Sequence, residues 1–164
     1  MFERYRKAVR LCLCLFLIVC ISTACGDEMY DIPVSELKEK MDAAMPGLPE
    51  MTVIRNTDGD AEGNLARLLE LDYDLVKEYY YEYAKEGTAE EMAVLRMKDT
   101  NGVIDAKNSF SARLEQRRNM YQTYLPDEVS KLEKARIVVK GNYIAFVVSN
   151  SPDGGADAFE NALK

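Results

Sequence analysis

The chain has 164 residues, no histidine, four cysteines, and 28 acidic against 21 basic residues, which gives a formal net charge of −7. Without histidine the chain lacks the commonest general base and the commonest metal ligand at neutral pH, so zinc hydrolases, Ser-His-Asp hydrolases and Cys-His enzymes are excluded. The acidic balance also argues against a nucleic-acid partner, which requires a basic face to neutralise phosphates.

The first 24 residues have the three parts of a secretory signal peptide. Residues 11–21 (LCLCLFLIVCI) form an apolar stretch, and Ser22-Thr23-Ala24 supplies small residues directly before Cys25. A retained transmembrane helix needs about 20 predominantly apolar residues, and this stretch is shorter. We therefore expect residues 1–24 to be a lipoprotein signal peptide that is removed on export. Within the signal peptide, the cationic region in front of the apolar stretch consists of four basic residues: Arg4, Arg6, Lys7 and Arg10.

Cys25 is predicted to carry a lipid on its sulfur. A cysteine directly after Ser-Thr-Ala resembles a lipobox, although Ser22 stands where that motif usually has leucine. Cleavage of an ordinary secretory signal, without lipidation, is therefore the alternative interpretation. The other three cysteines lie within the signal peptide, so the mature chain would keep Cys25 alone and would form no disulfide.

Residues 25–33 are predicted to be a lipidated tether, and residues 34–164 a single α+β domain. Removal of the signal leaves 140 residues, which is enough for one domain and too few for two. The mature chain has 17 basic and 27 acidic residues, a net charge of −10, which disfavours contact with anionic lipid headgroups. We therefore expect the lipid on Cys25 to be the membrane contact.

The first half of the domain is predicted to contain two helices and three strands. Ser35 is a suitable N-cap for the first helix, and the third segment is rich in tyrosine, which favours a strand. The spacing of Val76, Tyr80 and Tyr83 in that segment also fits a helix. In chain order we expect a helix over 35–45, a strand over 51–54, a turn-rich loop over 55–63, a helix over 65–71, and strands over 76–83 and 92–98.

The second half begins with the longest predicted helix, over residues 103–124, which Pro126 ends. Residues 135–140 (ARIVVK) and 143–149 (YIAFVVS) are the clearest strands, and Gly141-Asn142 between them is suited to a two-residue hairpin. Residues 156–164 are expected to form a short final helix. This order predicts an α+β fold, with an antiparallel sheet of about four strands and helices packed mainly on one face.

Four short segments form a set that resembles a known family. They are Asp72-Tyr73-Asp74-Leu75, Arg113-Leu114-Glu115-Gln116-Arg117, Tyr121-Gln122-Thr123-Tyr124-Leu125-Pro126 and Gly141-Asn142-Tyr143. With the lipobox and the acidic spacer after it, the set resembles the small Gram-positive lipoproteins catalogued as domain of unknown function 4358, over about residues 31–149. The resemblance implies a membrane-anchored extracytoplasmic domain and no established activity, so it supplies no functional residues.

The residues of these segments also have structural interpretations. Tyr121 and Tyr124 are expected to pack the long helix onto the sheet, Pro126 to end that helix, and Gly141 to satisfy the hairpin turn.

The acidic loop Asp58-Gly59-Asp60-Ala61-Glu62-Gly63 has carboxylates at the first, third and fifth positions of a calcium loop. Its twelfth position is Leu69, where a calcium loop requires a bidentate glutamate, so an ordinary acidic turn is favoured. Pairs of carboxylates for glycoside hydrolysis are not favoured either, since 140 residues offer little cleft for a polysaccharide. We predict no catalytic residues, no metal and no cofactor.

The candidate interaction surface consists of tyrosines and arginines. Tyr79, Tyr81 and Tyr83 share one face of the predicted strand, and tyrosine offers rigid contact area with a polar tip. Arg113 and Arg117 on the long helix add an anion-binding stripe. The alternative is that these tyrosines lie in the core and that the basic face of the helix is merely solvated.

Taken together, the sequence predicts a non-enzymatic, lipid-anchored protein on the extracytoplasmic face of the cell membrane. Its expected partners are the membrane, through Cys25, and an envelope protein or cell-wall component. The alternative is a small-ligand-binding accessory lipoprotein of an uptake system.

Overall fold

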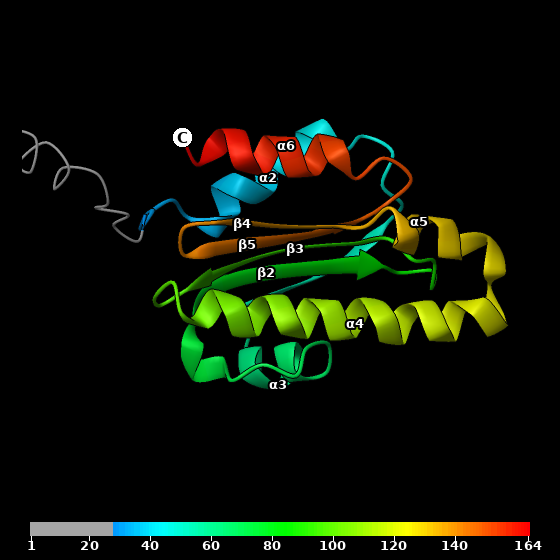
Figure 1. Ribbon diagram of the computed structural model, residues 1–164, viewed down its shortest axis with the longest axis horizontal. Helices are drawn as coiled ribbons and strands as arrows, with labels where there is room; N and C mark the ends of the chain where they lie inside the picture. Colours follow the sequence, from blue (N-terminus) through cyan, green and yellow to red (C-terminus); the bar gives the residue numbers. More distant parts are fainter. Residues whose placement is uncertain (1–27) are drawn as a thin grey trace, which may run out of the picture.

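The computed structural model describes residues 28–164 (Figure 1). The predicted signal peptide and the predicted lipidation site, Cys25, lie outside the described residues. Within the described part, no helix is long and apolar enough to cross a membrane.

A five-stranded antiparallel sheet forms the centre of the fold, in the order β1-β2-β3-β5-β4. The predicted antiparallel sheet is confirmed, with five strands in place of about four, since β1 pairs along its whole length with β2. Gly141 adopts a φ of +55° in the predicted hairpin between β4 and β5. The strands are β1 (Met51–Arg55), β2 (Val76–Ala84), β3 (Glu91–Met97), β4 (Arg136–Lys140) and β5 (Tyr143–Val148).

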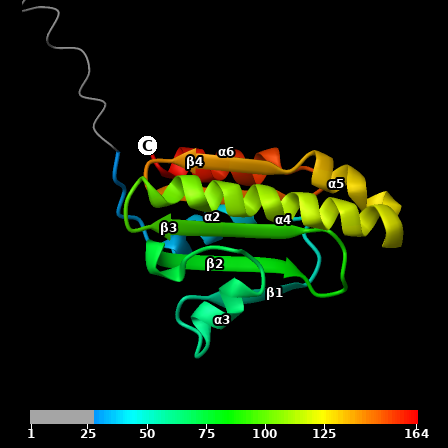
Figure 2. The ribbon, with the colours of Figure 1, turned by 60° about the horizontal axis from the view of Figure 1, so that its bottom comes forward.

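Helices cover both faces of the sheet, which corrects the prediction that they pack mainly on one face (Figures 1 and 2). Helices α3 (Ala61–Ala66) and α4 (Gly102–Tyr124) lie on one face, and α2 (Val34–Ala44) and α6 (Asp153–Ala162) on the other. The physical reason is that every residue of β3 and β5 is buried. A strand that is buried on both sides requires cover on both sides.

The side chains of the sheet therefore divide into two cores. On the α4 face, the ring of Phe110 stacks on that of Phe146 with centroids 4.9 Å apart, and Tyr81 stacks on Phe110 at 6.3 Å. On the other face, α2 and α6 contribute Leu37 and Phe159, which are fully buried.

The ends of two predicted helices differ from the prediction. Helix α3 begins at Ala61 and ends at Ala66, whereas we expected a helix over 65–71. Helix α6 begins at Asp153, whereas we expected the final helix over 156–164, so it includes Gly154. A Cβ at Gly154 would lie 2.8 Å from the carbonyl oxygen of Ala44, so this glycine permits the close contact between α2 and α6.

Three short helical segments complete the fold, and the sequence did not predict them. They are the 3₁₀ helices η1 (Tyr73–Leu75) and η2 (Pro126–Glu128) and the helix α5 (Val129–Glu133). Pro126 ends α4 as expected and also begins η2.

The sheet has two ends that differ in what lies against them. Residues 28–33, which we call the strap, contact the end where β3 finishes and β5 begins, and the C-terminus lies at this end too (Figure 1). The opposite end, which we call the hollow end, carries the β2–β3 loop and the residues that follow β5.

Candidate functional site

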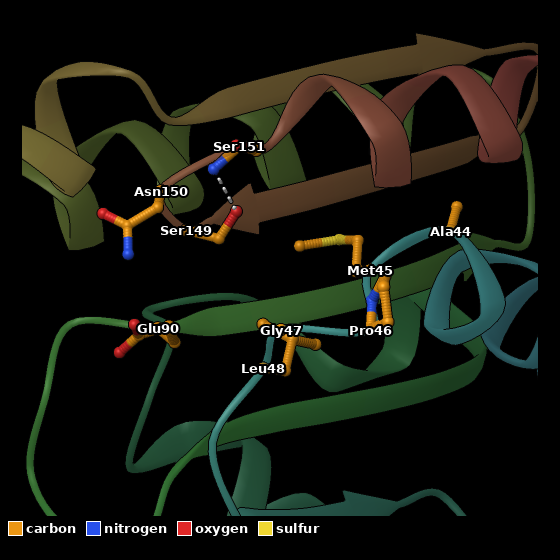
Figure 3. A pocket seen from close by; sticks show the side chains of 9 residues that line it. All are labelled: Ala44, Met45, Pro46, Gly47, Leu48, Glu90, Ser149, Asn150 and Ser151. Carbon is orange, nitrogen blue, oxygen red and sulfur yellow. Dashed lines mark hydrogen bonds between the residues drawn. The ribbon is translucent and has the colours of Figure 1, made fainter.

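An open hollow of about 350 Å³ lies at the hollow end of the sheet (Figure 3). Three segments that are distant in sequence line it: residues 44–48 after α2, Glu90 before β3, and residues 149–151 after β5. The hollow exists because these segments all leave regular structure at the same end of the sheet.

The lining of the hollow is partly polar and partly apolar. Ser149, Asn150 and Ser151 present hydroxyl and amide groups, and the backbone N–H of Ser151 donates to Ser149 Oγ at 3.1 Å. Met45 and Leu48 supply apolar surface opposite them (Figure 3). Such a lining suits the binding of an uncharged polar or mixed surface.

Glu90 is the one ionisable side chain among the described residues that line the hollow. Its Oε1 accepts a hydrogen bond from Lys131 Nζ at 2.7 Å, and the same ammonium group donates to Glu128 at 2.8 Å. Burial raises the pKa of Glu90, but the hydrogen bond and the charge of Lys131, with the nearby Thr88 hydroxyl and the backbone, outweigh burial, so the pKa is lowered. Neither Glu90 Oε2 nor Thr88 Oγ1 has a hydrogen bond of ordinary geometry. Glu90 is therefore a charged, paired carboxylate.

The Glu90 carboxylate is turned away from Met45 and Leu48 in Figure 3. Together with Lys131 and Glu128 it connects β3 to α5, and Glu128 also accepts from the backbone N–H of Ala89 at 2.7 Å. These groups fix the wall of the hollow.

A second charged cluster lies between the sheet and α4, centred on Glu91. The Glu91 side chain is fully buried, and its Oε1 lies 2.7 Å from Arg113 Nη2 and 2.9 Å from Arg117 Nε. Arg113 Nε and the Tyr81 hydroxyl both donate to its Oε2. Burial, together with the Glu91 charge, raises the pKa of Tyr81 well above its ordinary value, so this hydroxyl stays protonated.

Arg117 and Tyr121 connect the same helix to the β2–β3 loop. Arg117 donates to the carbonyl oxygen of Thr88 at 3.2 Å, and its guanidinium lies 4.6 Å from the ring centroid of Tyr121. The Tyr121 hydroxyl donates to the carbonyl oxygens of Gly87 and Thr88. Helix α4 is thereby held on the sheet by polar contacts at its C-terminal half and by apolar packing at its N-terminal half.

These contacts correct the interaction surface predicted from the sequence. Tyr79 and Tyr81 are fully buried and Tyr83 is half-buried, because α3 and α4 cover this face of β2. Arg113 and Arg117 are 12% and 13% exposed and pair with Glu91, so they form no free anion-binding stripe. The alternative interpretation, core tyrosines, describes Tyr79 and Tyr81.

The sequence reasoning missed Glu91, although a signal for it was present. Strand β3 reads EMAVLRM, and apart from Arg96 near its end a carboxylate in such an apolar strand indicates a buried ion pair. Arginines four residues apart lie on the same face of a helix, so Arg113 and Arg117 were the natural partners.

The acidic loop before α3 is an ordinary turn. The Asp58 carboxylate accepts the backbone N–H of Arg55 at 2.8 Å, and the Asp60 carboxylate pairs with Arg67 at 3.2 Å. Over residues 28–164, no group of three or more Asp, Glu, Cys or His side chains is arranged to hold a metal ion.

Exposed apolar side chains gather near the C-terminal end of α4. Met120, Tyr124 and Leu125 are 43%, 77% and 46% exposed. Tyr121 packs onto the fold as expected, whereas the same expectation for Tyr124 is wrong, because α4 extends beyond the sheet at this end (Figure 1). The hollow and this helix end lie at the same end of the sheet, since Tyr121 contacts the β2–β3 loop.

A comparison with protein-family models matches residues 50–149, which is 100 of the 164 residues, to a family described as Domain of unknown function (DUF4358). The chain belongs to this family. The match begins at β1 and ends after β5, so it includes the whole sheet, α4 and the Glu91 cluster, and leaves out α2 and α6. No curated protein and no solved structure matches the chain.

Proposed function

We propose that this member of the DUF4358 family is a Gram-positive lipoprotein. In this proposal residues 1–24 are cleaved, Cys25 is lipidated, and the folded part lies on the extracytoplasmic face of the membrane. It acts without catalysis, by binding a protein or cell-wall component of the envelope at its hollow end.

One observation carries the proposal: the strap and the hollow lie at opposite ends of the sheet. Tyr30 contacts Asn142, directly before β5, whereas Ser149 in the wall of the hollow directly follows β5. Asn142 and Ser149 flank the six residues of β5 and are seven residue steps apart, so at about 3.3 Å per residue they are about 23 Å apart. A lipid on Cys25, close to the strap in sequence, therefore places the hollow on the side away from the membrane.

The absence of catalysis is supported by what the described ionisable groups do. Glu90, Glu91 and Lys131 are all held in ion pairs, and the chain has no histidine to act as a base at neutral pH. The hollow offers hydroxyl, amide and thioether groups, which bind well and catalyse poorly.

The alternative is a small-ligand-binding accessory lipoprotein of an uptake system. The hollow favours it to the extent that about 350 Å³ falls within the range of ligand pockets, roughly 300–1,000 Å³. The hollow is open, however, and the exposed Tyr124 and Leu125 lie at the same end of the sheet, on the α4 side, where they offer more surface than a small ligand covers. A macromolecular partner contacts both the hollow and these exposed side chains.

Photo-crosslinking on intact cells tests the proposal. A photoreactive residue at Asn150 or Tyr124, at the hollow end, is expected to capture one envelope partner. The same residue at Lys98, at the strap end, is the matched control and is expected to capture none. Equal capture at both ends, or none at either, would contradict a binding role for the hollow end.

A further inference from the structure

The strap is bonded to the folded chain through its backbone. The N–H of Tyr30 donates to Asn142 Oδ1 at 2.8 Å, and the N–H of Ile32 donates to the Tyr143 hydroxyl at 3.0 Å. The Tyr143 hydroxyl donates in turn to the carbonyl oxygen of Ile32, and Arg96 Nη2 donates to that of Tyr30 at 3.3 Å. Backbone groups of the strap make these four bonds, and the Asp31 carboxylate of the strap adds an ion pair with Arg96.

The groups that receive the strap are fixed by the sheet. Asn142 and Tyr143 are fully buried and Arg96 is almost so. Asn142 Nδ2 donates to the carbonyl oxygen of Met97 at 3.4 Å, so the amide oxygen is turned toward the strap. The Arg96 guanidinium lies 5.5 Å from the ring centroid of Tyr143. Contacts outside the strap therefore help to hold Asn142 and Arg96, so they lose less side-chain freedom on binding the strap.

Gly141 allows the strap to pass. A Cβ at Gly141 would lie 2.2 Å from the carbonyl oxygen of Glu28 and 2.8 Å from the ring of Tyr30, which no side chain can satisfy. Gly87 in the other hairpin also has a positive φ, +79°, but nothing lies within 4 Å of a Cβ there. The turn alone requires a glycine at both positions, and the strap adds a second requirement at Gly141.

We propose that Arg96, Gly141, Asn142 and Tyr143, here called the clamp, hold the strap so that the lipid anchor fixes the orientation of the folded chain on the membrane. The orientation rests on the lipidation proposed above, whereas the clamping of the strap does not. The hairpin segment Gly141-Asn142-Tyr143, which the family resemblance singled out, is thereby assigned a role beyond its turn.

The clamp shortens the length of free chain between Cys25 and the first fixed residue of the fold. From Cys25 to Tyr30 there are five residue steps, at most about 17 Å of extended chain. Without the clamp, the first fixed residue would be Val34, in α2, and the tether would reach about 30 Å. Such a reach exceeds the length of β5 and would let the molecule turn over on the membrane.

Hydrogen exchange on the mature full chain tests the clamp. Tyr143→Phe keeps the buried ring and removes the hydroxyl, so the amides of residues 28–33 are expected to exchange about ten-fold faster. Tyr79→Phe is the matched control, because it removes a buried hydroxyl that donates to the carbonyl oxygen of Ala61, away from the strap. Unchanged exchange of the strap in Tyr143→Phe overturns the clamp, and so does equal acceleration in Tyr79→Phe.

A second pair of variants uses the two glycines. Gly141→Ala and Gly87→Ala introduce the same backbone strain at positive φ, but only Gly141→Ala is expected to expose the strap. If Gly141→Ala fails to fold, Tyr143→Phe still decides the outcome. Protection of the strap in a folded Gly141→Ala protein also overturns the clamp.

Energy transfer in membranes tests the orientation. A donor on Tyr124→Cys, the one free thiol of a mature chain whose Cys25 is lipidated, reports its distance from acceptor lipids. Adding Tyr143→Phe is expected to raise transfer and broaden the distance distribution, and adding Tyr79→Phe to do neither. Faster strap exchange with unchanged transfer overturns the orienting role. A chain that is absent from membranes refutes the lipidation instead, and strap exchange measured on the released chain still decides the clamp.

Discussion

Oε1 of Glu91 lies 2.7 Å from Nη2 of Arg113, in an interior where the Glu91 side chain is fully buried. The pair joins the first residue of β3 to the middle of α4. The Tyr81 hydroxyl also donates to the carboxylate, and Arg117 forms a second ion pair with it. A buried ion pair gains little over an apolar core of the same shape, but removal of one partner leaves the other charge without compensation. The Glu91 cluster therefore makes the position of α4 on the sheet sensitive to a single residue.

Glu91→Gln is expected to lower the free energy of unfolding by about 3–5 kcal/mol, because two guanidinium groups lose their buried counter-charge. Glu115→Gln is the control: Glu115 lies on α4 and pairs with Arg118 at the surface. This substitution is expected to change stability by less than about 1 kcal/mol. Urea denaturation of both variants measures the difference. Equal effects would show that the Glu91 cluster is dispensable for holding α4.

The two carboxylates Glu82 and Glu90 are expected to give opposite pH dependences of stability. Burial, with Asp42 nearby, raises the pKa of Glu82 although Lys38 opposes it, whereas hydrogen bonds outweigh burial and lower the pKa of Glu90. Glu82 therefore destabilises the fold above its folded pKa, and this penalty disappears as the pH falls below about 4.5. Glu90 stabilises the fold above about 4.5, and this contribution is lost as the pH falls through its folded pKa.

Urea denaturation between pH 7 and pH 3.5 measures both effects. Glu82→Gln is expected to raise the urea midpoint at pH 7 and to leave it unchanged at the acid end. Glu90→Gln is expected to lower the midpoint at pH 7. The difference between this midpoint and that of the unsubstituted protein is expected to shrink toward pH 3.5. Parallel pH profiles for the two variants would contradict the assigned pKa directions.

Tyr121 and Tyr124 lie three residues apart on α4. Substitution of Tyr121 is expected to affect stability, and substitution of Tyr124 to affect binding alone. Tyr121 is buried and donates to the β2–β3 loop, so Tyr121→Ala is expected to destabilise the fold by about 3–5 kcal/mol. Tyr124 is 77% exposed, so Tyr124→Ala is expected to change stability by less than about 0.5 kcal/mol. Thermal unfolding measures both.

Tyr124→Ala also tests the proposed binding surface. Tyr124→Ala is expected to reduce crosslinking from a photoreactive residue at Asn150 at least five-fold, without loss of the folded protein from the membrane fraction. Undiminished crosslinking would remove Tyr124 from the binding surface and leave the hollow alone as the contact.

The hairpin at Gly141 shows what the sequence predicts well and what it does not. Two strands of high β propensity around a Gly-Asn pair define a hairpin locally, and the structure confirms it. The strap that crosses this glycine is more than a hundred residues away in the chain. No local pattern carries that contact, so the role of Asn142 and Tyr143 as partners of the strap could not be predicted.

The tyrosines of β2 show a second contact that local sequence patterns do not predict. Alternation and aromatic propensity predict the strand at 76–83 correctly, but they do not say which helices cover each of its faces. Both faces are buried at Tyr79, Tyr80 and Tyr81 because α2 and α6 pack on one and α3 and α4 on the other. Strand β5 and the middle of β3, residues 92–95, carried a signal for two-sided burial, since apolar residues there do not alternate with polar ones.

Cys25→Ala is expected to abolish membrane attachment, because the thioether that would carry the lipid requires the cysteine sulfur. The variant chain is expected either to appear in the medium after cleavage or to remain as an unprocessed precursor, and fractionation with mass spectrometry distinguishes these forms. Cys20→Ala is the matched control, since it removes a cysteine five residues earlier, within the apolar stretch of the signal. It is expected to leave attachment intact. A Cys25→Ala chain that is cleaved and still retained by the membrane as firmly as the Cys20→Ala chain would refute lipid anchoring.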